Sequence, residues 1–363
     1  MKLLVDIGHP AHVHLYRYFI SEMEQMGHRV FVTVKDIPAA KELLDIYSIK
    51  YMDLGKKRDS IWGKGLHQLR YNLKTFNVVR KEKIDYGIGS SITLAHVSRL
   101  TGMKSFIFDD DDNEVEPFFV KFVHPFAHCI LSPDCLRFQR NGKRDITYAG
   151  YHELAYLHPN RFIPDPGVLR DAGLKAGETF FVMRFNVFKA HHDSGIRGLS
   201  LKQKLQLVEM LKKKGKILVT TERDMEPELR RYRVKVSPAG IHSLLYYAAM
   251  FIGDSQTMTS EAAVLGTPAI RCNSFVGRIT YLEEEEHKYK LTFGFKPGRF
   301  EQMVRKIEEL LAMPDLKEEW QKRRRQMLRD KIDITAFMVW FIEHYPESLQ
   351  VVRENPDYQY RFK

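Results

Sequence analysis

Histidines gather in a short segment that directly follows the first apolar run of the chain. Residues 2–7 (KLLVDI) lead into Gly8, and His9, His12 and His14 come within the next six residues. The pKa of a histidine is near neutrality, so its ring can take a proton from a hydroxyl group or return one. We expect His12 to act as a general base, and Gly8 and His14 to contact substrate. The alternative is that these histidines only cap or cover the following helix.

A run of acidic residues follows another apolar segment. Residues 105–108 (SFIF) lead straight into Asp109 and Asp110, and the acidic run continues to Glu116. Neighbouring carboxylates raise one another's pKa, which suits acid–base chemistry or the binding of a divalent ion. An ordinary solvated loop is the other interpretation. We expect Asp109 or Asp110, which are nearest the apolar segment, to be catalytic, and we expect no metal site.

Small and basic residues follow two further apolar segments. Ser90 and Ser91 come after residues 86–89 (YGIG), and a turn of small residues lets a ligand approach the backbone. Arg184 ends the run 179–184 (TFFVMR), and its planar guanidinium matches phosphate oxygens. A plain turn and a solvent-facing strand end are the alternatives. We expect all three side chains to bind substrate.

The segment 250–270 (MFIGDSQTMTSEAAVLGTPAI) joins an apolar run to a helix with a polar start. Free N–H groups and the helix dipole attract phosphate at such a position, and hydroxyl groups add hydrogen bonds. A carboxylate in the first turns, here Glu261, can accept both hydroxyls of a ribose. An ordinary capping box is the alternative. Four residues at the start of this helix are expected to bind a ligand: Asp254, Ser255, Gln256 and Thr257.

The elements that must position these residues follow from the hydrophobic pattern. Short apolar runs predict buried strands, and amphipathic stretches between them predict helices. Their alternation is typical of parallel sheets covered by helices on both faces. Strands are expected at 2–7, 29–34, 50–54, 86–89, 104–108, 129–132, 179–184, 216–221, 250–253 and 268–272, and helices at 11–26, 39–47, 65–81, 94–100, 201–213, 241–249, 260–265 and within 299–345.

A break in composition divides the chain into two halves. Residues 141–169 hold three prolines and few apolar pairs, so we place a linker near residues 150–177. The sequence therefore predicts an α/β protein of two Rossmann-like, doubly wound domains that face a cleft. The first covers residues 1–160, and the second covers residues 161–363 with the terminal helices. Ligands of such sheets bind at the carboxyl ends of strands, where the polar segments described above fall.

Composition excludes several classes of protein. The chain has 363 residues, and 57 Lys and Arg against 46 Asp and Glu give a net charge of +11, which favours anionic partners. No RNA-binding motif accompanies this charge, so we expect no nucleic acid partner. No G-x-G-x-x-G follows the first strand, and we expect no cofactor. Three cysteines are too few for a disulfide framework, which favours the cytoplasm.

A basic stretch precedes an aromatic one near the end of the chain. Residues 321–331 (QKRRRQMLRDK) are followed by residues 335–345 (TAFMVWFIEHY), and such a pair of helices can lie on an anionic membrane surface. An exposed helix followed by a core-packed tail is the alternative. We therefore expect that this cytoplasmic protein can also lie at the inner face of the membrane.

Two of these segments resemble motifs of known families. Residues 253–270 are similar to the donor-nucleotide motif of GT-B glycosyltransferases and UDP-N-acetylglucosamine 2-epimerases, in which a small polar turn precedes a Glu, small residues and G-x-P. Residues 8–14 (GHPAHVH) resemble the loop of the peptidoglycan N-acetylglucosaminyltransferase that acts on lipid I. As far as about residue 345, the chain resembles the family of domain of unknown function 354, in the same superfamily.

The resemblance implies a role for each matching position. Ser255, Gln256 and Thr257 would hold the donor diphosphate, and Glu261 would hold the ribose. His12 takes the place of the loop histidine of the lipid-I enzyme. Asp109 and Asp110 take the place of an acid that the epimerases keep within an HxEAGxR motif. The sequence FDDDDNEVEP lacks the rest of that motif. The epimerases also carry a histidine–arginine pair after the first strand of the second domain, for which Arg184 and His191 or His192 are the nearest candidates here. These departures favour a transferase over an epimerase.

The expected function is therefore sugar transfer from a nucleotide-sugar donor, with uridine diphosphate as its carrier, in glycan or polysaccharide biosynthesis. The resemblance leaves the sugar, the acceptor and the oligomeric state open, and a lipid-linked acceptor at the membrane surface is one option. A nucleotide-sugar 2-epimerase or hydrolase is the second hypothesis. A non-catalytic module that binds a nucleotide-sugar or nucleic acid is the third.

Overall fold

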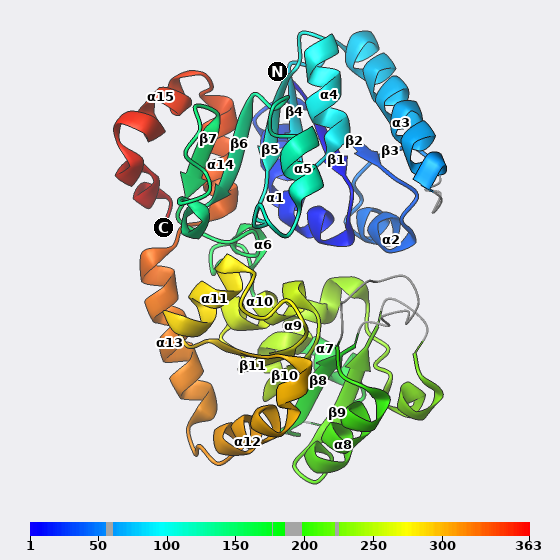
Figure 1. Cartoon of the computed structure of the whole chain (residues 1–363), viewed down its shortest axis with the longest axis vertical. Coiled ribbons are helices and arrows are strands. Elements are labelled where there is room, and N and C mark those ends of the chain that lie inside the picture. The colour runs from blue at the N-terminus through cyan, green and yellow to red at the C-terminus, as the bar shows by residue number, and fades with distance from the viewer. Residues whose placement is uncertain (56–60, 176, 186–197, 222–224) are drawn as a thin grey trace. The chain divides into compact units, whose positions relative to one another are not determined.

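The chain forms two compact units. The computed structural model describes residues 1–55, 61–175, 177–185, 198–221 and 225–363. Unit 1 consists of Met1–His158 together with Lys331–Lys363, and unit 2 consists of Pro159–Asp330. Each unit is built around its own parallel sheet (Figure 1).

Unit 1 has a parallel sheet in the order β3-β2-β1-β4-β5-β6-β7. Its central strands are buried on both faces because helices cover them, and this explains their continuous apolar runs. The strand order reverses between β1 and β4, and ligands bind at such a switch point in doubly wound sheets. Among the described residues, the strands are β1 Lys2–Ile7, β2 Arg29–Val34, β3 Met52–Asp53, β4 Tyr86–Gly89, β5 Lys104–Phe108, β6 Cys129–Pro133 and β7 Asp145–Tyr148, and the helices are α1 Pro10–Gln25, α2 Pro38–Ile46, α3 Ile61–Glu82, α4 Ile92–Leu100, α5 Pro117–Phe122, α6 Leu154–Leu157, α14 Ile334–Glu343 and α15 Glu347–Glu354.

Unit 2 repeats this construction with fewer strands. Its sheet is parallel and has the order β12-β11-β10-β8-β9, with the switch point between β8 and β10. In the described part of this unit, the strands are β8 Phe180–Arg184, β9 Lys216–Thr220, β10 Met250–Gly253, β11 Ala269–Cys272 and β12 Thr292–Phe295, and the helices are α7 Gly167–Asp171, α8 Leu201–Leu211, α9 Ile241–Tyr247, α10 Gln256–Leu265, α11 Thr280–His287, α12 Phe300–Leu311 and α13 Leu316–Asp330.

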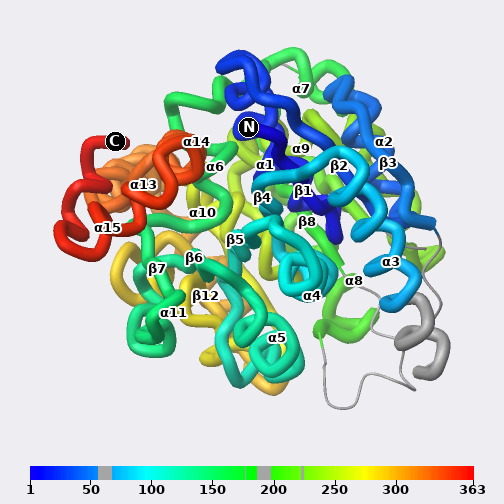
Figure 2. Tube along the Cα trace, turned by 90° about the horizontal axis from the view of Figure 1, so that it is seen from above, coloured from blue at the N-terminus to red at the C-terminus, as the bar shows by residue number. Residues whose placement is uncertain are grey.

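The end of the chain returns to unit 1, which corrects the expected second domain of residues 161–363. Helix α14 packs against α1 and α6, and α15 lies against β7, as both views show (Figures 1 and 2). Phe341 of α14 is fully buried, and its ring lies 6.2 Å from that of Phe106 in β5. Lys331 is also fully buried and pairs with Asp134 at 2.8 Å. The apolar face of α14 therefore completes the core of unit 1.

Several segments without a predicted element are ordered, among them β12, α5 and the two described next. The expected linker begins after β7 and contains α6, whose residues are all buried. The acidic stretch 281–290 forms most of α11 and is not simply solvated, because Glu285 is fully buried and accepts a hydrogen bond from Ser260 at 2.6 Å. Each helix of the described residues is too short or too polar to span a bilayer.

Candidate functional site

At the switch point of each sheet, one strand ends in a glycine, and no residue with a side chain fits at that position. A Cβ atom on Gly89 of β4 would lie 2.9 Å from the carbonyl oxygen of Asp6 in β1. A Cβ atom on Gly253 of β10 would lie 2.2 Å from the carbonyl oxygen of Arg184 in β8. The strand ends therefore approach each other closely in both units. This approach brings together the loops that the sequence marked as candidate sites.

In unit 1, the switch-point loops begin helices. His9 is the N-cap of α1 and accepts a hydrogen bond from Ala11 N at 3.2 Å. Ser91 is the N-cap of α4 and accepts one from Leu94 N at 3.2 Å, and Ser90 Oγ donates to the carbonyl oxygen of Phe108. Ser90 thus holds the turn after β4 against the end of β5, and Ser91 caps the helix that follows the turn.

His12 lies in the first turn of α1 and is neutral at physiological pH. Burial, with smaller contributions from His9 and His152, lowers its pKa from 6.5 to about 3. The backbone N–H of Gly8 donates to His12 Nδ1 at 3.3 Å, so the ring proton is assigned to Nε2. A group with this pKa is a poor base near pH 7 but a good neutral hydrogen-bond donor. The geometry therefore favours donation by His12 over the expected base role.

His14 lies apart from His12. Only 6% of its surface is exposed, and its Nδ1 lies 3.3 Å from the Tyr47 hydroxyl. Its ring also packs 5.4 Å from that of Tyr156. Residues two apart on a helix face opposite sides, so His14 packs against α2 and α6 and does not share the surface of His12. A direct contact with substrate, as the sequence predicted for His14, has no support in this packing.

Asp109 holds the acidic loop in place. It is 4% exposed, and its Oδ2 pairs with His124 Nε2 at 2.7 Å and with Arg140 Nη2 at 2.8 Å. Its Oδ1 accepts a hydrogen bond from Asp111 N at 3.2 Å. A carboxylate with this many donors is a structural anchor, because removing it would leave the buried Arg140 uncompensated. The geometry therefore gives Asp109 a positioning role.

Asp110 is the more accessible neighbour, with 27% of its side chain exposed. Its Oδ2 lies 3.1 Å from His152 Nδ1. Burial acts to raise the pKa of Asp110, but the charge and hydrogen bond of His152, a backbone hydrogen bond and the nearby His12 together outweigh it, so the pKa is lowered from its ordinary value of 3.8. Asp110 is therefore ionised near neutral pH and accepts hydrogen bonds at the carboxyl edge of the sheet.

His152 is a residue that the sequence analysis missed, because it lies in the expected linker. It follows β7, and its ring stacks on Tyr148 with centroids 6.4 Å apart. Its Nε2 and the Tyr148 hydroxyl are buried, and neither atom has a hydrogen-bond partner among the residues described. Buried polar atoms are rarely left unpaired, so we expect a ligand or a water molecule to form hydrogen bonds with these two atoms.

Asp111 behaves differently from Asp110. Burial, together with the charges of Asp110 and Asp109, raises its pKa from 3.8 to about 8. Asp111 is therefore mostly protonated at neutral pH, beside an ionised Asp110 and a neutral His12. Because their pKa values differ in this way, Asp110 can accept a proton and Asp111 can donate one within the same site.

In unit 2, helix α10 begins earlier than predicted. It starts at Gln256, and Ser255 is its N-cap, accepting from Met258 N at 3.4 Å. Gln256 and Thr257 therefore occupy its first turn. The carbonyl oxygen of Asp254 accepts a hydrogen bond from Asn273 Nδ2 at 2.9 Å, which ties this loop to the end of β11. Arg184 ends β8 across the switch point, and His191 and His192 lie outside the described residues.

Glu261 lies in the second turn of α10 and is 4% exposed. Its Oε1 lies 2.9 Å from His242 Nε2 of α9, which is itself 1% exposed. His242 is a second residue that the sequence analysis did not identify, since nothing in the sequence connects it to Glu261. The pair fixes the carboxylate of Glu261 against α9, the helix that carries His242.

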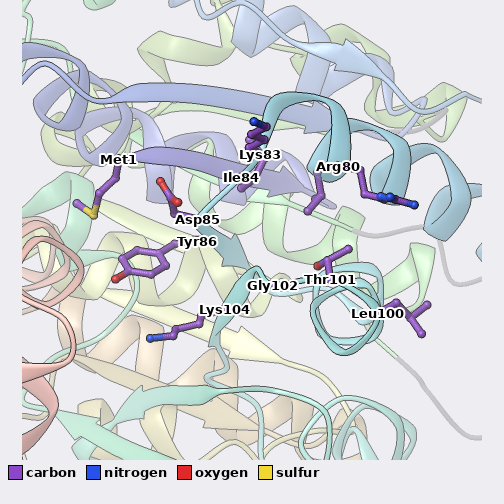
Figure 3. A pocket seen from close by; sticks show the side chains of 11 residues that line it. Met1, Arg80, Lys83, Ile84, Asp85, Tyr86, Leu100, Thr101, Gly102 and Lys104 are labelled. Atoms are coloured by element: carbon purple, nitrogen blue, oxygen red, sulfur yellow. The ribbon is translucent and has the colours of Figure 1, made fainter.

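A separate open groove lies at the opposite, amino-terminal edge of the unit 1 sheet. Its volume is about 700 Å³. Figure 3 shows Arg80, Lys83 and Lys104 around Asp85 and Tyr86. The groove is basic and does not include the switch-point residues. In the part of the chain described, no three His, Cys, Asp or Glu side chains are grouped to hold a metal ion.

Solved structures share this fold over most of their length. The UDP-GlcNAc 2-epimerase of Neisseria meningitidis, solved with UDP-GlcNAc, has a TM-score of 0.67 at 12% identity and covers 88% of this chain and 94% of its own. The glycosyltransferase SsfS6 of Streptomyces sp. SF2575, solved with thymidine diphosphate, has a TM-score of 0.60 at 12% identity and covers 93% and 99%. The chain therefore has the GT-B fold that these enzymes share.

Sequence comparison identifies the family. An uncharacterised protein of Methanocaldococcus jannaschii is 24% identical over 312 residues, which are 79% of this chain and 86% of that protein. Residues 1–295 match the family described as "Protein of unknown function (DUF354)". Because this match covers most of the chain, the protein is a member of the DUF354 family, as the sequence predicted.

Proposed function

We propose that this protein is a glycosyltransferase that moves a sugar from a nucleoside diphosphate, with uridine diphosphate as the first choice, to a hydroxyl acceptor. The proposal rests on two different polar sites, one at the switch point of each sheet. One switch point holds a helix N-terminus with an arginine, and the other holds groups that can exchange a proton. The nucleotide ligands of the two structural neighbours support this assignment.

The donor is assigned to unit 2. The first turn of α10 presents backbone N–H groups together with the side chains of Ser255, Gln256 and Thr257, and Arg184 ends the neighbouring strand. These groups suit a diphosphate, whose negative charge increases as the bond to the sugar breaks. Glu261, held by His242, is assigned to the ribose hydroxyls. Asp254 orients the loop between β10 and α10 through its carbonyl oxygen.

The acceptor is assigned to unit 1. Asp110 takes the proton from the acceptor hydroxyl, and the oxygen then bonds to the anomeric carbon of the sugar. The bond from that carbon to the diphosphate breaks, and the nucleoside diphosphate leaves with the electron pair. His12 donates a hydrogen bond from Nε2, His152 and Asp109 position the carboxylates, and Gly8, Ser90 and Ser91 shape the turns.

Product analysis tests this proposal. The full chain is incubated with a UDP-sugar that is radiolabelled in the sugar, with and without a bacterial lipid extract as the acceptor source. Transfer predicts that label moves into the extract while free UDP appears in equal amount, and that Asp110→Asn lowers both rates by roughly 10²–10⁴. Label that stays in UDP-sugar or in free monosaccharide under every condition would contradict transfer.

A nucleotide-sugar 2-epimerase is the second candidate. Asp110 is ionised and the neighbouring Asp111 has a raised pKa, so the acidic loop holds the acid and the base that epimerisation requires. One structural neighbour is itself such an epimerase. The same experiment separates the two functions, since an epimerase converts the labelled sugar to its epimer without any acceptor.

A further inference from the structure

An exposed aromatic patch lies on one side of unit 1, between β5 and β6. Phe118 and Phe122 of α5 are 73% and 42% exposed, and Phe126 in the loop that follows is 38% exposed. The rings of Phe118 and Phe122 stack with their centroids 6.4 Å apart. No residue of helix α5 is fully buried, and only Phe119 is packed in part against the core of unit 1. We call these three side chains the aromatic patch; such exposed apolar groups mark interaction sites.

Cations surround the aromatic patch. Lys121 Nζ lies 5.7 Å from the centroid of the Phe122 ring. Arg99 Nε donates to the carbonyl oxygen of Phe126 at 2.9 Å, and Arg144 donates to the carbonyl oxygen of Pro125. Arg99, Lys121 and Arg144 are all exposed. The nearest exposed carboxylates in sequence, Glu114 and Glu116, precede α5 on the side of the acidic loop.

The basic surface continues from the patch to the groove at the amino-terminal edge of the sheet. Leu100, next to Arg99, is 70% exposed and lines that groove together with Arg80, Lys83 and Lys104 (Figure 3). One side of unit 1 therefore combines exposed apolar side chains with a row of cations. A partner that matches both features presents a negatively charged surface above an apolar layer.

The helices that the sequence marked for a membrane role do not offer such a surface. The apolar side of α14 is buried in unit 1, including Phe337, Met338 and Phe341. Trp320 of α13 is fully buried, and its indole N–H donates to the carbonyl oxygen of Leu291 at 2.8 Å. The aromatic patch is built from side chains that have no such place in the core.

We propose that the aromatic patch docks the protein onto an anionic phospholipid bilayer. The three phenyl rings enter the headgroup region, while Arg99, Lys121 and Arg144 meet the lipid phosphates. Helix α5 begins directly after the acidic loop of unit 1, so docking brings that loop near the bilayer. This inference does not rest on the proposed sugar transfer, because binding to a bilayer is measured without any reaction.

Vesicle sedimentation tests the inference. The full chain is mixed with vesicles of phosphatidylcholine alone or of phosphatidylcholine with phosphatidylglycerol, at low and at high salt. We expect binding to the anionic vesicles that weakens at high salt. The double variant Phe118→Ser/Phe122→Ser should bind at least about tenfold more weakly, because binding scales with the apolar area that enters the bilayer. Lys121→Ala should weaken binding about fivefold, as expected for one cation near the surface.

A matched variant on another helix serves as the control. Leu69 and Leu73 of α3 have the same four-residue spacing and are each 56% exposed. Leu69→Ser/Leu73→Ser should bind as the wild type does, and both double variants should keep the wild-type melting temperature. Three results would overturn the inference: unchanged binding by the α5 variant, loss of binding by the α3 variant instead, or a wild-type dimer that the α5 variant converts to a monomer.

Discussion

At the scale of single residues, Asp109 and Asp110 are neighbours with different surroundings. Asp109 is buried against Arg140 and His124, whereas Asp110 is partly exposed and paired with His152. Asp110→Asn should lower turnover by roughly 10²–10⁴ with nearly unchanged stability, since it removes a base. Asp109→Asn should lower the free energy of unfolding by about 3–5 kcal/mol, since it breaks a buried ion pair. Steady-state kinetics and urea unfolding of both variants measure these effects. If the two variants lost the same turnover and the same stability, Asp109 and Asp110 would not have the different roles assigned to them.

Asp111 makes stability depend on pH. Its pKa is raised from 3.8 to about 8 in the folded protein, so the folded state binds more protons than the unfolded state between these values. Its contribution therefore lowers stability as the pH rises from about 4 to 8. The Asp111→Asn variant lacks this effect. Its free energy of unfolding at pH 8.5 minus that at pH 4.5 should therefore exceed the same difference in the wild type by at least about 1.4 kcal/mol. Urea unfolding at the two pH values measures this difference, and an identical pH dependence in variant and wild type would refute the assignment.

The activity profile separates the two acids. Because the pKa of Asp110 is lowered, a reaction that uses it as the base should lose no activity from its protonation between pH 5 and 7. If Asp111 were the base, the rate would instead rise through its pKa of about 8. Measuring kcat/KM of the wild type and of Asp111→Asn across this range identifies the base.

At the scale of elements, the contact between β8 and β10 depends on Gly253. A Cβ atom there would lie 2.2 Å from the carbonyl oxygen of Arg184, so Gly253→Ala must push the two strands apart. We expect a loss of about 1–3 kcal/mol in the free energy of unfolding and weaker nucleotide binding. Gly298→Ala is the control in the same unit, because no atom lies within 4 Å of its added Cβ. If both variants melt alike, the close approach of the strands is not required.

The element pattern was largely predictable from the sequence, and the site was less so. Strands β1 and β4 match their expected ranges because all but their first residues are buried, which leaves continuous apolar runs. β2 also matches its range, although only its second half is buried. β7 and α6 were missed because they lie in the stretch 141–169, whose few apolar pairs and three prolines favoured a linker. The pair formed by Asp110 and His152 joins residues far apart in the chain, so no local pattern could reveal it. The separation of His12 from His14 follows from helical geometry alone.

At the scale of the whole molecule, the last segment of the chain is part of unit 1. Phe341 is fully buried there, so Phe341→Ala should cost about 3–5 kcal/mol in the stability of that unit. This corresponds to a shift of roughly 6–20 °C in its melting temperature. Differential scanning calorimetry measures the shift, with the exposed Phe118→Ala as the control. A shift confined to the transition of unit 2 would contradict this assignment.

Calorimetric titration with UDP measures whether α10 and Glu261 of unit 2 bind the nucleoside diphosphate of the donor. We expect UDP to bind the wild type with one site per chain, and Glu261→Gln to bind it at least about tenfold more weakly, because a carboxylate accepts a hydroxyl more strongly than an amide does. Asp110→Asn should bind UDP as the wild type does. Equal affinity in the wild type and Glu261→Gln, or no binding by the wild type, would contradict the account.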